Sequence, residues 1–141
     1  MVLRSGTVEV KLNVTARNRL DDKRERVSDD TNGSYQFFPW VAVGPDGAVN
    51  VVFHDQREAP ITPLYHTCLS RSIDGGRSFQ RNIRLSDEIS DSSHDGFGGT
   101  FIGDYIGIAA SSLGVYPVWT DIRASNGLPE IYVRPLRFGN L

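Results

Sequence analysis

The sequence is poor in cysteine, in long apolar runs and in excess charge of one sign, and each shortage excludes a class of protein. Cys68 is the single cysteine, so an internal disulfide bond and a metal site built from several cysteines are both excluded. No apolar run approaches the roughly 20 residues of a membrane-spanning helix, so we expect no membrane partner. The first residues lack the apolar core of a signal peptide, and the localisation stays open.

The charges are nearly balanced. The chain has 15 Lys and Arg against 17 Asp and Glu, a net charge of −2, which gives no electrostatic attraction to a nucleic acid. The basic residues are dispersed apart from residues 23–26, a run that Glu25 interrupts. We interpret that run as a solvated loop or strand edge, and expect no nucleic-acid partner.

Length and composition indicate one folded domain over residues 1–141, with 39% hydrophobic and 23% charged residues. Helical periodicity is scarce, whereas 14 Gly and 7 Pro are scattered as turn signals. Short β-rich segments recur between these turns and predict an all-β fold of about nine strands. The expected strands are residues 7–14, 24–28, 37–43, 49–54, 65–71, 81–86, 104–110, 115–120 and 130–134.

An internal repeat supports the all-β prediction. Residues 49–57 align with residues 115–123, which lie 66 positions further on, and both segments end in Asp-x-Arg. Residues 27–29 match residues 85–87, which lie 58 positions further on. The repeating unit is therefore one strand, a loop of variable length and three further strands.

Residues 72–79 form the most informative motif, S-x-D-G-G-x-S-F, between two expected strands. Consecutive glycines permit the positive φ angles of a tight turn, and the Asp can accept hydrogen bonds from backbone N–H groups that follow it. The Phe can fold back as an apolar plug. We therefore assign a structural role to its defined positions, which are Ser72, Asp74, Gly75, Gly76, Ser78 and Phe79.

This motif resembles the Asp-box of the sialidase-like β-propellers (BNR repeats), where it forms the turn between the third and fourth strands of a blade. Further segments look like the C-terminal half of bacterial members of that family: residues 36–40, 53–57, 101–107 and 117–123. The resemblance implies four-stranded antiparallel blades. Residues 7–28 would be the last two strands of one blade, residues 37–86 a full blade, and residues 103–137 three strands of the next.

Two to three blades cannot close a ring, because closed propellers need four to eight. Three explanations follow: the chain is the C-terminal part of a longer propeller, several copies assemble a ring as a homo-oligomer, or the strands close as a small sandwich or barrel. We favour the first for the history of the gene and homo-oligomerisation for the chain in solution. An unfinished ring would expose strand edges and blade faces, which folded proteins avoid.

Strand order places the residues that could carry chemistry. Successive strands of a blade are antiparallel, so the Asp-box turn lies at the end opposite the loops that begin at Asp55 and Asp121. What the resemblance implies at that opposite end is an arginine grip on a substrate carboxylate, an Asp acid and a Tyr–Glu nucleophile pair. The candidates are Arg57 and Arg123 for the grip, Asp104 or Asp95 for the acid, and Tyr105 polarised by Glu58 for the nucleophile. Asp55, Asp121 and His94 are candidate substrate-binding residues.

A structural interpretation competes with the catalytic one. An Asp two residues before an Arg, present in both repeats, suits a salt bridge or loop clamp, and catalytic residues seldom recur at one repeat position. We favour the clamp. His54, His66 and His94 are too scattered for a metal site, and we expect no cofactor. Calcium at Asp87, Glu88, Asp91 and Asp95 is an alternative, although their spacing fits no standard calcium loop.

Three functions follow from the sequence. The favoured one is a glycan-binding or structural module completed by self-association, because the catalytic set is incomplete. The first alternative is an exo-α-sialidase-type glycoside hydrolase that is active only in a completed ring. The second is a truncated gene product without an activity of its own.

Overall fold

The computed structural model describes residues 9–10, 23–96, 105–123 and 128–138, and its fold is all-β with antiparallel pairing throughout. This confirms that the chain is all-β, as predicted. The only helix in those residues is a 3₁₀ turn, η1 (Ser92–His94). The strands are β1 (Glu9–Val10), β2 (Glu25–Arg26), β3 (Gln36–Val43), β4 (Val49–Asp55), β5 (Leu64–Ser72), β6 (Ile83–Arg84), β7 (Ser90–Asp91), β8 (Ile106–Ser111), β9 (Gly114–Asp121) and β10 (Glu130–Val133).

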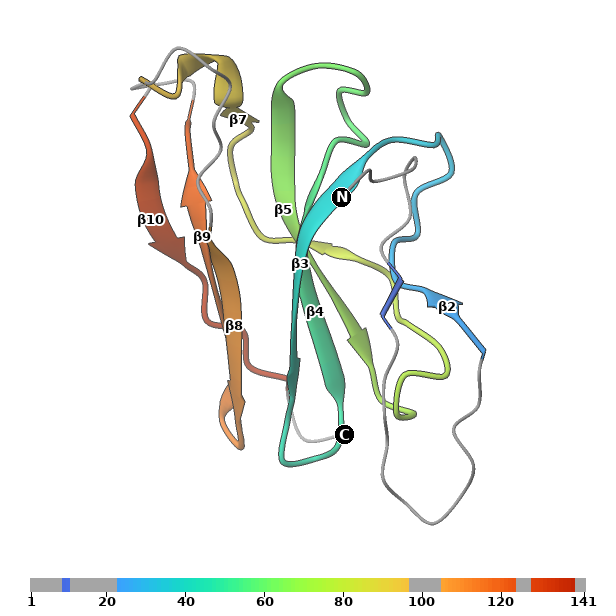
Figure 1. Ribbon diagram of the computed structural model, residues 1–141. Helices are drawn as coiled ribbons and strands as arrows, with labels where there is room; N and C mark the ends of the chain where they lie inside the picture. The colour runs from blue at the N-terminus through green and yellow to red at the C-terminus, as the bar shows by residue number, and fades with distance from the viewer. Residues whose placement is uncertain (1–8, 11–22, 97–104, 124–127, 139–141) are drawn as a thin grey trace.

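The strands form three sheets that lie side by side (Figure 1). The first pairs β1 with β2, the middle sheet has the order β3-β4-β5-β6 with β7 also on β5, and the third has the order β10-β9-β8. The sequence did not predict β7, and it predicted a longer β6. That strand stops early because the backbone N–H groups of Leu85 and Ser86 both donate to the carbonyl of Thr67, which breaks the regular ladder.

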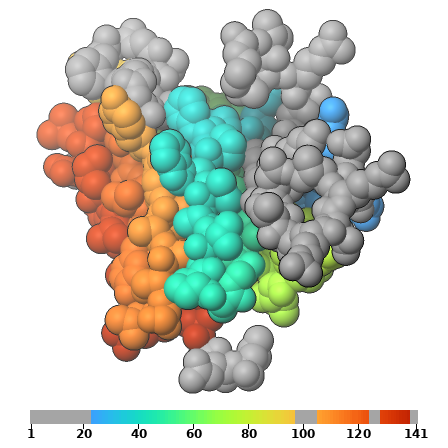
Figure 2. Space-filling model, turned by 60° about the horizontal axis from the view of Figure 1, so that its bottom comes forward, coloured from blue at the N-terminus to red at the C-terminus, as the bar shows by residue number. Residues whose placement is uncertain are grey.

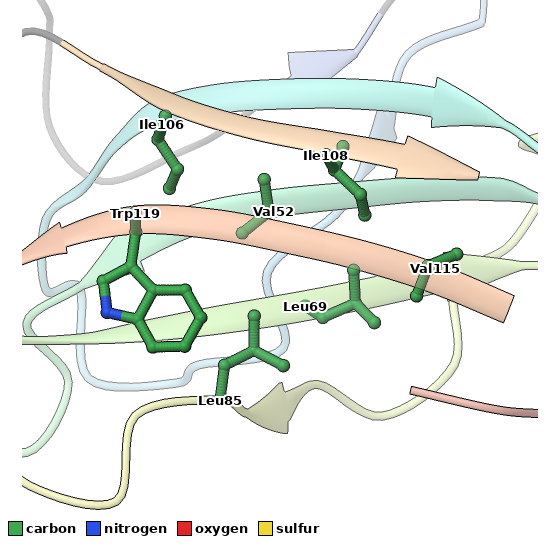
Figure 3. Close-up of a cluster of buried hydrophobic side chains, with 7 residues drawn as sticks. All are labelled: Val52, Leu69, Leu85, Ile106, Ile108, Val115 and Trp119. Atoms are coloured by element: carbon green, nitrogen blue, oxygen red, sulfur yellow. The ribbon is translucent and has the colours of Figure 1, made fainter. Parts of the chain in front are cut away.

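The central strands of the middle sheet, β4 and β5, are covered on both faces, and every residue of β4 is therefore buried. On one face lies a first apolar cluster, which Phe79 of the Asp-box turn also contacts: Val27, Val49, Val51, Phe53 and Cys68. The opposite face contributes to a second cluster, drawn in Figure 3: Val52, Leu69, Leu85, Ile106, Ile108, Val115 and Trp119. Figure 2 shows the β8–β9 hairpin lying against the β3–β4 hairpin, so the second cluster joins the middle and third sheets.

Hydrogen bonds close the Asp-box turn. Asp74 Oδ1 accepts from the backbone N–H groups of Arg77 (2.9 Å) and Ser78 (3.0 Å), and Oδ2 accepts from Ser78 Oγ at 2.6 Å. Gly76 N–H donates to Ser72 Oγ at 2.8 Å. These bonds hold the pKa of Asp74 below its ordinary range, the hydroxyls of Ser78 and Ser72 contributing most. The turn is therefore held by its own polar groups.

Gly75 and Gly76 have φ angles of 75° and 87°, values that a side chain would strain. Glycine therefore suits both positions of the motif.

The buried His54 makes stability depend on pH. Its Nδ1 lies 3.0 Å from Thr67 Oγ1, its ring contacts Phe37 and Tyr65, and burial lowers its pKa to about 3. Between about pH 6.5 and about pH 3, His54 is protonated in the unfolded chain but not in the folded chain. Over that range its contribution should lower the free energy of unfolding by about 1.4 kcal/mol for each pH unit. Urea unfolding between about pH 7 and about pH 5.5 measures this slope.

Two variants identify the histidine responsible for the slope. His54→Asn should unfold with a clearly shallower pH dependence, whereas His94→Asn, at an exposed position, should keep the contribution of His54 to that dependence. Burial also lowers the pKa of His66, so part of the slope remains in both variants. Equal slopes in the two variants would contradict this assignment.

Candidate functional site

Arg57, just after β4, holds three segments together. Its Nε and Nη2 donate to Asp55 Oδ2 at 2.8 Å and 2.7 Å, and its backbone N–H donates to Asp55 Oδ1 at 2.8 Å. Nη2 also donates to Asn82 Oδ1 at 2.7 Å, and Nη1 pairs with Asp29. Asn82 and Asp29 bond each other through Asn82 N–H and Asp29 Oδ2, at 2.9 Å. The guanidinium therefore ties the end of β4 to the segment that follows β2.

Arg123 makes the same connection one repeat further on. Its Nη2 lies 2.7 Å from Asp87 Oδ1 and 3.5 Å from Asp121 Oδ2, and its guanidinium carbon lies 3.9 Å from the centre of the Tyr132 ring. Asp87 follows Asp29 by 58 positions, and the Asp121–Arg123 pair follows Asp55–Arg57 by 66. We call this joint the inter-repeat clamp: an Arg, the Asp two residues before it, and an Asp at the end of the preceding repeat.

The clamp determines what these arginines can do chemically. A guanidinium grips a substrate carboxylate through two parallel N–H donors, which must be open to the substrate. Burial alone would lower the pKa of Arg57, but hydrogen bonds and charge from Asp55 and Asp29 raise it above its ordinary value. The hollow beside Arg57 is about 190 Å³, below the roughly 300 Å³ at which small-molecule sites begin. The geometry therefore favours the structural interpretation of both Asp-x-Arg pairs.

Among the other predicted site residues, Glu58 lines the small hollow beside Arg57. Glu58 pairs with Arg84 (3.1 Å) and with His66 (3.2 Å), and the described residues show no hydrogen bond between Glu58 and Tyr105. Tyr105 lies exposed just before β8. Asp104 lies outside the described residues, so its role as an acid stays a prediction.

The loops do converge at one end of the molecule, away from the Asp-box turn (Figure 1). The segment around β7 bonds the loops that follow both β4 and β9: Asp91 N–H donates to Ile122 O at 2.8 Å, and Ser92 N–H donates to Pro63 O at 3.1 Å. This is the arrangement that strand order predicts. His94 lies in η1 at this end, where its Nδ1 is 3.1 Å from Asp91 Oδ2.

In the described part of the chain, no group of three or more His, Cys, Asp or Glu residues is arranged to hold a metal ion. Asp87, Glu88, Asp91 and Asp95, the residues of the calcium alternative, form no such group, and three of them have other partners. Asp87 and Glu88 pair with Arg123, and Asp91 accepts from the backbone N–H and hydroxyl of Ser93. The described part of the chain contains no helix that is long and apolar enough to cross a membrane.

No protein-family model and no curated protein matches the chain. Its function is therefore inferred from the clamps, from the surfaces of the sheets and from a larger hollow at the Asp-box end.

That hollow has a volume of about 830 Å³ and lies between the β3–β4 turn, the Asp-box, the β8–β9 turn and the C-terminal segment. Arg71 lines it, with Nη1 donating to Asn50 Oδ1 at 2.8 Å and Nη2 to Asp46 Oδ2 at 2.5 Å. Its guanidinium carbon lies 4.1 Å from the centre of the Phe138 ring. Sequence reasoning missed this hollow, because four distant segments form its walls.

Proposed function

We propose that the chain is a non-catalytic segment of a sialidase-like propeller, a structural module that is completed by self-association. The middle sheet supports the kinship: it contains four consecutive antiparallel strands, and the Asp-box turn joins the third to the fourth. That is the position of the turn in the blades of that family. The middle and third sheets pack face to face, as successive blades do.

The inter-repeat clamp carries the proposal of a non-catalytic role. Arg57 and Arg123 are the two arginines predicted to grip a substrate carboxylate, and both bind carboxylates of the chain itself. A substrate would have to displace a fully buried acidic partner, Asp55 or Asp121, from each. Displacement would remove a buried carboxylate from its ion pair, at a cost of several kcal/mol for Asp55. The cost is smaller for Asp121, which keeps hydrogen bonds from Ser90 and Trp119.

Solution mass and an enzyme assay together test this function. Closed propellers contain four to eight blades and each copy has about two, so light scattering should give roughly two to four times the 15.6 kDa of one chain. A fluorogenic sialoside should show no turnover above background with the associated protein. Turnover that a folded Arg57→Lys variant abolishes would instead establish the hydrolase alternative.

Glycan binding is a second candidate, which the larger hollow favours. Its volume of about 830 Å³ falls within the range of small-molecule sites, and its lining includes two arginines, Arg71 and Arg137, and the hydroxyls of Ser111 and Ser112. A glycan array probed with the wild-type chain and with Arg137→Gln tests this candidate. Signals that the substitution leaves unchanged would exclude the hollow as the glycan site.

A further inference from the structure

The chain contains one complete example of the interface between consecutive repeats. Val52 and Leu69 of the middle sheet have no exposed surface, because the third sheet covers them. On the other side of this interface, Ile108 of β8 is only 9% exposed (Figure 3). The repeat allows each side of this interface to be located a second time in the same chain.

The first side recurs on the outer face of the third sheet. Val118 lies 66 positions after Val52, and it pairs with Val133 as Val52 pairs with Leu69. Val118 is 37% exposed and Val133 is 59% exposed, although both of their equivalents are fully covered. We call this face the tail surface and define it by Val118, Ile131 and Val133.

The second side recurs on β3. Ile108 pairs with Pro117 in the third sheet, and Val41 pairs with Val51 in the middle sheet. Because Val51 lies 66 positions before Pro117, Val41 is the repeat equivalent of Ile108. By the same register Val43 is the equivalent of Ala110. Val41 is 40% exposed and Val43 is 56% exposed. We call this the head surface and define it by these two valines.

We infer that the chain associates head to tail with a second copy of itself, the tail surface of one copy packing on the head surface of the next. The two surfaces are the free counterparts of an interface that already forms within the chain, so its apolar complementarity is present on the molecule. Such a contact is heterologous, and it closes into a ring or grows as a filament. This inference rests on the proposed function and adds the surfaces and their polarity.

The strand edges are consistent with this polarity. β10 is an edge strand of the third sheet, whereas β5, its counterpart in the middle sheet, pairs with β6. β2 precedes β6 by 58 positions and is its repeat equivalent. In the assembled pair, β2 of the second copy would lie along the open edge of β10, in the place that the two-residue β1 takes in the single chain.

Two single substitutions test the inference, because each blocks one surface. Val133→Lys places a charge on the tail surface and Val43→Lys places one on the head surface; both side chains are exposed, so each variant should fold. Burying an unpaired ammonium in the contact should weaken association at least about 100-fold. Each variant alone should therefore be a monomer by light scattering. An equimolar mixture should form a dimer of about twice 15.6 kDa, because one free head and one free tail remain.

Leu113→Lys, at an exposed apolar position in the β8–β9 turn, is the matched control and should keep the wild-type mass. Three results would overturn the inference. If wild type, Val43→Lys and Val133→Lys have the same oligomeric mass, the chain does associate with itself, but through other surfaces. If Val43→Lys alone dimerises, the contact joins two tails. A wild-type monomer at high concentration would remove both this inference and the self-association in the proposed function.

Discussion

Replacement of Arg57 by alanine is expected to lower the free energy of unfolding by about 3–5 kcal/mol, the usual cost of removing one partner from a buried ion pair. The carboxylate of Asp55 is fully buried and accepts three hydrogen bonds from Arg57, two of them from the guanidinium. In the alanine variant only the hydrogen bond from the backbone N–H remains. Urea unfolding followed by tryptophan fluorescence measures the loss.

Arg123→Ala is the matched variant, and it should cost clearly less, about half as much. Asp121 is also fully buried, but it keeps two donors when Arg123 is removed: Ser90 Oγ at 2.6 Å and Trp119 Nε1 at 3.1 Å. The difference between the variants therefore tests whether the clamp acts by satisfying the buried carboxylate. Equal losses would show that it does not.

Gly114→Ala should destabilise the chain by at least about 3 kcal/mol, because it combines backbone strain with a steric clash. Gly114 has a φ angle of 146°, and a Cβ there would fall on the Leu136 carbonyl oxygen and 3.1 Å from the carbonyl carbon. The backbone cannot yield easily, since Val115 and Leu136 exchange two hydrogen bonds of 2.9 Å at this point. Thermal unfolding or, if the variant does not fold, its recovery in soluble form measures the effect.

Gly47→Ala separates the two causes. Gly47 also has a positive φ, 76°, but no atom lies within 4 Å of the position that a Cβ would take. This variant should show only the strain of about 1–2 kcal/mol that a side chain meets in the left-handed region. A loss at Gly114 no larger than that at Gly47 would mean that the Leu136 contact gives way.

The sequence was sufficient for elements whose cause is local. Short β-rich segments between turn signals predicted β4, β5 and β9, and the Asp-box glycines predicted a turn whose φ angles are positive. The match between residues 27–29 and 85–87 contained the signal for the clamp, because it placed an Asp at the same point of both repeats. The ion pairs themselves could not be predicted from this match, because the partner arginines lie 28 and 36 positions away.

Features assembled from distant segments could not be predicted. β7 depends on pairing with β5 and on a bridge from Ser90 to Arg123. Its two residues, Ser90 and Asp91, do not indicate a strand by themselves. The ion pairs of Glu58 with Arg84 and His66 have no periodic signal in the sequence, which instead suggests Tyr105 as the partner of Glu58. The catalytic candidates were drawn from a family resemblance, whereas the bonds that occupy the arginines depend on the packing of two repeats.

The inter-repeat clamp also makes the unit portable. A segment cut after Asp29 and ending at Asp87 contains Arg57 and, at its end, the Asp that the next unit's arginine requires. An in-frame duplication of residues 30–87 would therefore reproduce the joint at the new boundary without any further substitution. The loops within a unit can differ in length, because the two Asp residues lie 58 positions apart and the two Arg residues 66. A gene built this way can gain or lose whole units by recombination, and each added unit arrives with its connection to the one before.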